Sequence, residues 1–194
     1  MFVIRKKSDN RGVRAFTHKL ADIAGGVNIA TADLTQSVLP EGTPIGRDSN
    51  GLYHVVKTAV LTANAANDAT TYTVKKGHNF KVGDIIMAKT SGKAYAITTI
   101  ATNSGNNAYD DITVGTTLGV AVTAGDVLMQ AASAGASGSA FKYQPLALTG
   151  EAYDVHSDGN IFANAWLIGV VKEANLESPI NDTIKAAISG IKFM

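Results

Sequence analysis

The stretch Leu39–Leu61, LPEGTPIGRDSNGLYHVVKTAVL, indicates the fold class more clearly than any other part of the chain. Leu39–Gly46 carries two prolines and two glycines, which mark a turn between short strands. Asn50-Gly51 is the dipeptide typical of two-residue β-hairpin turns. Leu52–Leu61 follows with one apolar face, as in a half-buried strand. We therefore predict short strands joined by tight turns.

The same pattern of short strands and turn residues continues over residues 71–130. Five strands are predicted there: Tyr72–Val74, Asp84–Lys89, Ala94–Ile100, Asp111–Val114 and Asp126–Gln130. This spacing predicts a small barrel or sandwich. A polar connector, TANAANDAT at 62–70, precedes the module. The segment AASAGASGSA at 131–140 follows it, and its small residues predict a flexible linker.

Two stretches of this module resemble each other. FKVGDIIM at Phe80–Met87 and VTAGDVLM at Val122–Met129 both place a Gly-Asp turn before an apolar strand. We expect the glycine to supply a positive φ and the aspartate to accept hydrogen bonds from nearby amides. Two interpretations remain open: an internal duplication, or the repeated use of a common turn.

The last third of the chain returns to strands and then changes period. Strands are predicted at Pro145–Leu148, Ala152–Val155 and Ala163–Lys172. Trp166 is predicted to anchor the core. Over residues 179–190 the pattern predicts one short helix, with Asn181 as its N-cap, Asp182 complementing the dipole and Gly190 in a left-handed terminating conformation. Ile191–Met194 alternates as a terminal strand.

Residues 1–36 are rich in basic side chains at their start and have no steady period. They predict an extended arm with a short turn of helix near Phe16–Ile23. Two interpretations are open: a solvated terminus, or an arm that becomes ordered on a partner surface. For the second, the candidate docking residues are Arg5, Lys6, Lys7, Arg11 and Arg14.

Together these boundaries predict a mainly β protein. It has a small β-sandwich or barrel framework with an inserted β module, an extended N-terminal arm and one short C-terminal helix. The predicted regions are the arm at 1–36, the split framework at 37–61 plus 142–194, and the inserted module at 65–135. Small residues on both sides of the insert suit a domain inserted into a surface loop.

Motifs for catalysis, metal binding and cofactor binding are missing from the sequence. The chain has no cysteine, which excludes disulfides, Cys-ligated zinc and thiolate nucleophiles. The four histidines have no recognised metal spacing, and HExxH, EF-hand, GxSxG and phosphate-loop patterns are absent. We therefore expect no catalytic residue, no metal and no cofactor. A dispersed acid pair including Glu41 or Glu151 is the remaining enzymatic alternative.

Charge gives little reason to expect nucleic acid or membrane as partners. The formal net charge is +1, and charged residues make up 17% of the chain against about 25% in an ordinary domain. No stretch approaches 18 continuous apolar residues, and no signal peptide is recognisable. These features fit a protein made in the cytoplasm.

Three features taken together resemble the framework of head-fibre and capsid-decoration proteins of tailed phages. They are the Leu39–Gly46 turn, the Asn50-Gly51 hairpin followed by His54–Lys57, and the closing Pro179–Met194 block of helix, Ser-Gly and strand. The resemblance covers the first and last thirds of the chain. It implies a homotrimer without catalytic residues, bound to the major capsid protein on the outer surface of the virion, with the insert facing outward.

A different function class remains open for the inserted module. Residues 65–135 could form a carbohydrate- or cell-surface-binding module, with host-surface glycans as the partner. The aromatic residues available for stacking on a sugar are Tyr72, Phe80, Tyr95 and Tyr109.

Overall fold

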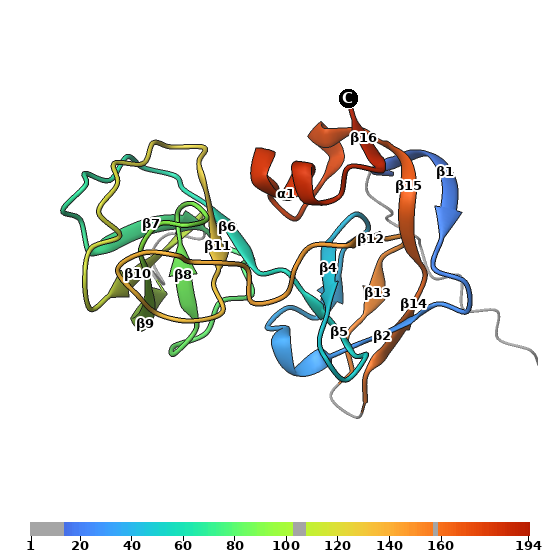
Figure 1. Ribbon diagram of the computed structural model, residues 1–194, viewed down its shortest axis with the longest axis horizontal. Helices are drawn as coiled ribbons and strands as arrows, with labels where there is room; N and C mark the ends of the chain where they lie inside the picture. Colours follow the sequence, from blue (N-terminus) through green and yellow to red (C-terminus); the bar gives the residue numbers. More distant parts are fainter. Residues whose placement is uncertain (1–13, 103–107, 157–158) are drawn as a thin grey trace, which may run out of the picture.

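The computed structural model describes residues 14–102, 108–156 and 159–194. Figure 1 shows two β-rich lobes side by side, joined at a narrow neck. We call the described residues of 14–56 and 142–194 the framework lobe, and those of 57–141 the barrel lobe. Strands make up 42% of the chain and helices 7%, so the predicted mainly β fold class is confirmed.

An eight-stranded sheet forms the framework lobe, in the order β1-β15-β12-β4-β5-β2-β14 with β16 beside β15. The bounds are β1 (Phe16–Asp22), β2 (Val27–Ile29), β4 (Pro44–Arg47), β5 (Tyr53–Val55), β12 (Ala147–Thr149), β14 (Ile161–Ala163), β15 (Ala165–Val171) and β16 (Ile191–Phe193). Outside this sheet, β3 (Val38–Leu39) pairs with β13 (Tyr153–Asp154). The helical segments are η1 (Thr31–Asp33), η2 (Glu173–Asn175) and α1 (Asp182–Ala187).

The framework sheet closes on itself because the strands at its two ends are continuous with each other along the chain: β1 leads into β2, and β14 leads into β15. At one end β1 pairs antiparallel with β15, and at the other β2 pairs antiparallel with β14. Only Asn164 separates β14 from β15, and between β1 and β2 the Ile23 N–H donates to the Ala165 carbonyl at 2.9 Å. The framework is therefore a small closed barrel, one of the two architectures that the sequence predicts.

Six strands form the barrel lobe, in the order β6-β11-β8-β9-β10-β7. They are β6 (Thr58–Val60), β7 (Thr71–Lys75), β8 (Ile85–Met87), β9 (Ala94–Thr102), β10 (Tyr109–Val114) and β11 (Val127–Gln130). An antiparallel bridge between Leu61 and Val74 joins the two ends of this sheet and closes it. Fully buried side chains fill its interior, including Tyr72, Ile86, Ile97, Ile112 and Leu128. All five strands predicted for the insert are present.

The two halves of the barrel lobe repeat the same three-stranded arrangement. Strands β6, β7 and β8 occupy the places that β9, β10 and β11 occupy in the other half. Met87 pairs with Met129, its own counterpart in the repeated stretch, and Tyr72 pairs with Ile112 in the same self-matched way. A pseudo-two-fold axis therefore passes through both pairs. The Leu61–Val74 bridge has its counterpart in the pairing of Ile97 with Val114.

The two repeated turns have the same geometry, as predicted. Gly83 has φ +91° and Gly125 has φ +98°, which a residue with a side chain rarely adopts. The carboxylate of Asp84 accepts from the Lys81 N–H at 2.9 Å, and that of Asp126 accepts from the Thr123 N–H at 2.7 Å. The predicted turn is thus present in both halves of the barrel lobe.

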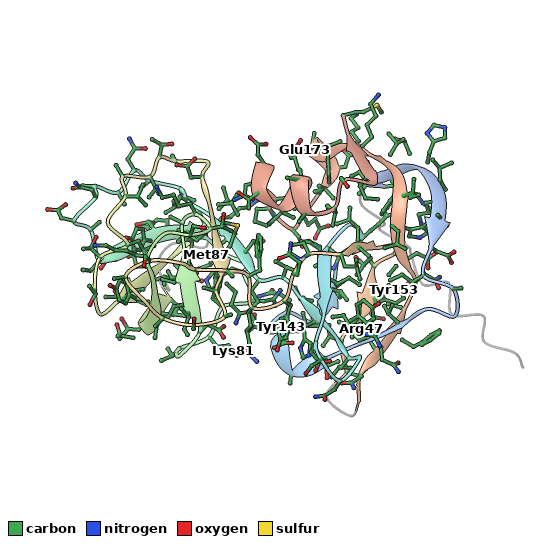
Figure 2. All side chains as sticks on the ribbon, in the orientation of Figure 1. Arg47, Lys81, Met87, Tyr143, Tyr153 and Glu173 are labelled. Carbon is green, nitrogen blue, oxygen red and sulfur yellow. The ribbon has the colours of Figure 1, made fainter. Side chains whose placement is uncertain are left out.

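Helix α1 packs where the two lobes meet (Figure 1). One hydrophobic cluster contains Ile184 and Ile188 from the helix region together with Met87, Met129 and Phe141 from the barrel lobe. Figure 2 labels Met87 on the side of the barrel that faces the neck. Trp166 is half-buried against the same cluster, which agrees with its predicted role as an anchor. The lobes therefore share apolar core and do not meet only through the neck.

The Asn181 cap of α1 is confirmed and gives a stability prediction. Its side-chain oxygen accepts from the Ile184 N–H at 3.1 Å. Asn181→Ala is expected to lower the free energy of unfolding by about 1 kcal/mol, because an amide at the helix start loses its partner. Urea unfolding measures this change. Thr183→Ala keeps the cap and serves as the control; an equal loss in both variants would contradict a specific capping role.

The predicted helical turn near Phe16–Ile23 is wrong. Residues Phe16–Asp22 form β1, paired with β15 from the far end of the chain. The hydrogen bonds come from a partner distant in sequence, so local periodicity does not reveal them. For residues 14–36, the expected separate arm is likewise corrected, since β1, β2 and η1 belong to the framework lobe. Residues 1–13 lie outside the described part of the chain.

Two expectations about the insert also need correction. Thr58–Val60 was expected in the framework, but it is β6 of the barrel lobe, so the insert starts before residue 65. The segment at 131–140 is not a free linker. Ala94 and Gly135 exchange two hydrogen bonds, and Ser139 N–H donates to the Gly92 carbonyl. These contacts hold the segment against the barrel at Gly135 and Ser139.

Gly190 does not end α1 in the left-handed conformation, because its φ is not positive. A glycine is needed there for space: a Cβ atom would lie 2.3 Å from the Leu167 carbonyl oxygen. The chain therefore passes directly over β15 before β16 begins. The predicted terminal strand over Ile191–Met194 is confirmed as β16.

Candidate functional site

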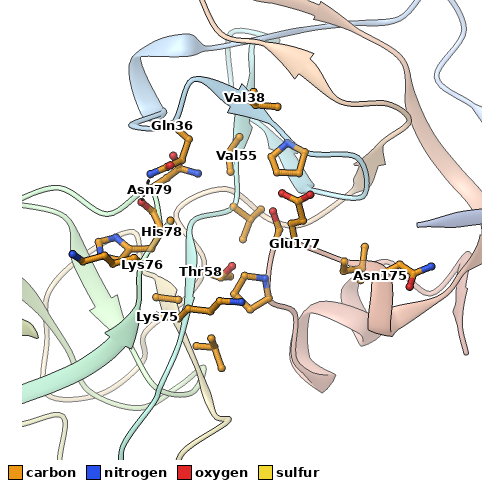
Figure 3. A pocket seen from close by; sticks show the side chains of 18 of the residues that line it. Gln36, Val38, Val55, Thr58, Lys75, Lys76, His78, Asn79, Asn175 and Glu177 are labelled. Carbon is orange, nitrogen blue, oxygen red and sulfur yellow. Dashed lines mark hydrogen bonds between the residues drawn. The ribbon is translucent and has the colours of Figure 1, made fainter. Parts of the chain in front are cut away.

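A cleft of ≈ 670 Å³ lies between the two lobes (Figure 3). Its framework wall comes from residues 36–38, Pro40 and residues 174–179 ahead of α1. Its barrel wall comes from Lys75–Asn79, at and beyond the end of β7. Val55, Val56 and residues 58–60, on the segment that runs from one lobe into the other, line the cleft between these walls. A cleft of this size between two lobes is the usual place for a ligand.

Polar contacts hold the two walls together at one end of the cleft. Asn79 Oδ1 accepts from the Thr35 N–H at 2.9 Å, and the His78 carbonyl accepts from Thr35 Oγ1 at 3.0 Å. Beside them, Lys81 Nζ donates to the Ala32 carbonyl at 2.6 Å. The cleft is the space that remains between the two walls beyond these contacts.

His78 is a buried titratable group in the barrel wall of the cleft. Its Nδ1 accepts from the Phe80 N–H at 3.2 Å, which places the ring proton on Nε2, 3.4 Å from Asp110 Oδ2. Burial lowers the pKa of His78 below its ordinary value of 6.5, and the Asp110 carboxylate opposes that shift only in part. His78 is therefore neutral at pH 7.

This arrangement predicts a loss of stability on mild acidification. The pKa of His78 is lowered in the folded protein, so the unfolded chain takes up the proton first. The stabilising contribution is present above pH 6.5 and is lost as the pH falls below that value. We expect the urea midpoint of the native protein to fall more between about pH 7 and about pH 5.5 than that of His78→Gln. Equal pH slopes for the two proteins would contradict the prediction.

A buried ionic network lies at the neck beside the cleft. Lys57 is 3% exposed, and its Nζ lies 2.8 Å from Asp84 Oδ2. The other oxygen of Asp84 accepts from Gln130 Nε2 at 2.8 Å. Every oxygen of this carboxylate thus has a donor, and the network fixes the first repeated turn to the neck.

His54 forms a second histidine cluster on the framework side of the neck. Its Nδ1 contacts Asp33 Oδ2, its Nε2 lies 3.5 Å from Asp48 Oδ2, and its ring stacks on Tyr143 at 3.9 Å. Burial is the largest cause of a raised pKa for the Tyr143 hydroxyl, and nearby carboxylates add to it. The cluster ties η1, β5 and the return connection together.

The sequence did not reveal these two histidine clusters. Each histidine meets a carboxylate far away in the chain, and no spacing rule relates them. His18 and His156 are exposed, as ordinary surface histidines are. No group of three potential metal-ligating side chains occurs within residues 14–102, 108–156 and 159–194.

The candidate docking residues fall mostly outside the described chain. Arg5, Lys6, Lys7 and Arg11 lie in residues 1–13. Arg14 is exposed, and its carbonyl accepts from Asn175 Nδ2 at 2.9 Å. Glu41, considered for an acid pair, accepts from the Ala15 N–H at 3.0 Å and lies 3.6 Å from Lys19 Nζ. These two contacts of Glu41 hold the start of β1 in place.

The structure weakens the predicted aromatic platform for sugars. Tyr72 and Phe80 are buried in the core of the barrel lobe, and Tyr95 and Tyr109 are partly buried. Two of the four rings are thus unavailable for stacking on a ligand.

None of the helices in the described residues is long and apolar enough to cross a membrane. Scans against protein-family models, curated proteins and solved structures find no match to this chain.

Proposed function

We propose that the protein is a non-enzymatic structural component of a tailed-phage virion, attached to the outer surface of the capsid. The framework lobe attaches, and the barrel lobe is displayed. One observation supports this proposal: the chain leaves the framework lobe once and returns to it once, both times at the neck. Gln130 N–H donates to the Lys57 carbonyl, and Lys142 N–H donates to the Gln130 carbonyl, so the two connections lie beside each other. Such a layout adds an outer domain without disturbing the framework.

Exposed apolar side chains on the framework lobe support attachment through that lobe. Leu20 is 70% exposed on β1, and Ile168 is 46% exposed on the adjacent β15, whose Cα register places Ile168 opposite Ala21. Phe162 on β14 is also exposed. Exposed apolar side chains on adjacent strands are typical of a surface that assembly buries. The partners would be the major capsid protein and two further copies of the chain.

The test mixes the purified protein with capsids that lack it and measures co-sedimentation. Leu20→Asp with Ile168→Asp is expected to weaken binding at least tenfold, because charge is placed on the attaching surface. Val82→Asp is the control, since Val82 is 63% exposed, between Ile168 and Leu20, but lies on the barrel lobe. The opposite pattern would show that the barrel lobe attaches, and no binding by the native protein would overturn the proposal.

A solution mass by light scattering tests the predicted trimer separately. The chain has a mass of 20.1 kDa, and a trimer has three times that mass. A mass that stays at 20.1 kDa at high concentration would contradict trimerisation. Deletion of residues 1–13, which leaves β1 in place, then tests whether the basic residues of that segment are needed for capsid binding.

A further inference from the structure

Each wall of the interlobe cleft carries one unbalanced charge. The titratable side chains that line the cleft within the described residues are Lys75, Lys76, His78 and Glu177. Lys76 Nζ lies 3.8 Å from Asp110 Oδ1, so a carboxylate of the same lobe already balances its charge. His78 is neutral at pH 7, because burial lowers its pKa. The cleft is therefore left with one cation, Lys75, and one anion, Glu177.

These two side chains come from opposite lobes. Lys75 is the last residue of β7 in the barrel lobe, and Glu177 lies between η2 and α1 in the framework lobe. Both are exposed, and neither forms an ion pair with another residue in the described part of the chain. Figure 3 shows Thr58 between them. A ligand in the cleft would therefore meet a positive group on one side and a negative group on the other.

Thr58 adds an uncharged polar group to the lining of the cleft. The residue is 6% exposed, and its hydroxyl has no hydrogen-bond partner among residues 14–102, 108–156 and 159–194. A hydroxyl both donates and accepts hydrogen bonds, so it suits a peptide group of a ligand. No Phe, Tyr or Trp lines the cleft within the described residues, which makes a stacked sugar ring less suitable.

We propose that the cleft binds a short peptide by its two free ends, with the terminal carboxylate at Lys75, the terminal ammonium group at Glu177 and a peptide group at Thr58. A ligand with a single charge would leave the charge of one wall unpaired, whereas a zwitterion matches both. The cleft volume of ≈ 670 Å³ is that of a site for a drug-sized ligand, which corresponds to about two or three residues. The proposal does not depend on the capsid role.

The experiment titrates the full-length protein with trialanine, measured by calorimetry and by the NMR signal of the Thr58 amide. We expect saturable binding in the millimolar range or tighter, with a shift of the Thr58 signal. Thr58→Val keeps the shape of the side chain but removes its hydroxyl. This variant should weaken trialanine binding about threefold, because the peptide group loses its partner.

Peptides blocked at one end show which wall reads which end. Lys75→Gln should weaken trialanine binding about fivefold, but should not change the binding of its C-terminal amide, which has no carboxylate. Glu177→Gln should weaken trialanine binding about fivefold, but should not change the binding of the N-acetylated peptide. The control variants are Lys192→Gln and Glu151→Gln, since both residues are exposed and lie outside the cleft lining. Neither control should change the affinity.

Three results would overturn the proposal. The first is the absence of saturable binding of trialanine to the native protein. The second is equal affinity for trialanine and for the peptide blocked at both ends, which would show that the cleft does not read the terminal charges. The third is binding of inorganic phosphate, lost in Lys75→Gln, without binding of trialanine, which would make the cleft a simple anion site.

Discussion

Asp84→Ala is expected to destabilise the protein by about 3 to 5 kcal/mol, because it leaves the buried ammonium group of Lys57 without its carboxylate. Lys57 Nζ and Gln130 Nε2 both lie 2.8 Å from Asp84 oxygens, and Lys57 is 3% exposed. Removing one partner of a buried pair costs far more than removing an exposed hydrogen bond. Urea unfolding followed by circular dichroism measures the change.

Asp126→Ala is the matched control for this prediction. Asp126 makes the same turn with Thr123 but is exposed, and the described hydrogen bonds of its carboxylate lie within that turn. Its loss should cost about 1 kcal/mol. The difference between the two variants isolates the buried network, since the turn is lost in both. Similar losses would show that the turn, and not the pair with Lys57, carries the stability.

Gly46→Ala is expected to cost about 3 kcal/mol and to displace the return connection from β4. A Cβ atom at Gly46 would lie 2.4 Å from the Gln144 carbonyl oxygen and 2.9 Å from the Tyr143 carbonyl carbon. Both contacts are with backbone atoms, so no rotamer change relieves them. Because Tyr143 stacks on His54, the NMR signals of the His54 ring should shift as well.

Gly115→Ala provides the comparison for Gly46→Ala. Its φ is not in the left-handed region, and the nearest atom to an added Cβ is Thr98 Cγ2 at 3.7 Å. This variant should change the free energy of unfolding by about 0.5 kcal/mol in either direction. If Gly46→Ala is equally mild, the return connection moves aside freely and does not fix the neck.

Local signals in the sequence predicted the strands of the insert and the helix cap well. Hairpin residues, the Gly-Asp turns and Asn181 affect only residues a few positions away in the sequence. Their geometry can therefore be predicted from the neighbouring sequence. The strand over Leu52–Leu61 shows the limit of this reasoning. Its alternation ends at the neck, where Val55–Ala59 are all buried, because the chain there passes from one lobe into the other.

Contacts between distant residues were beyond the reach of sequence patterns. Phe16–Asp22 forms a strand because β15 lies beside it, and 131–140 is held by hydrogen bonds to residues 91–94, about 40 positions earlier in the chain. The same holds for the pairing of His78 with Asp110 and of His54 with Asp33. The cleft between the lobes follows from these contacts, and no single motif marks it.

The self-matched pairs Met87–Met129 and Tyr72–Ile112 describe the contact that two separate copies of the three-stranded unit would make as a homodimer. A gene fusion would then have turned an intermolecular interface into an intramolecular one. In a homodimer both copies must keep identical edges. Once fused, each half can evolve alone, so the two halves need no longer keep identical edges.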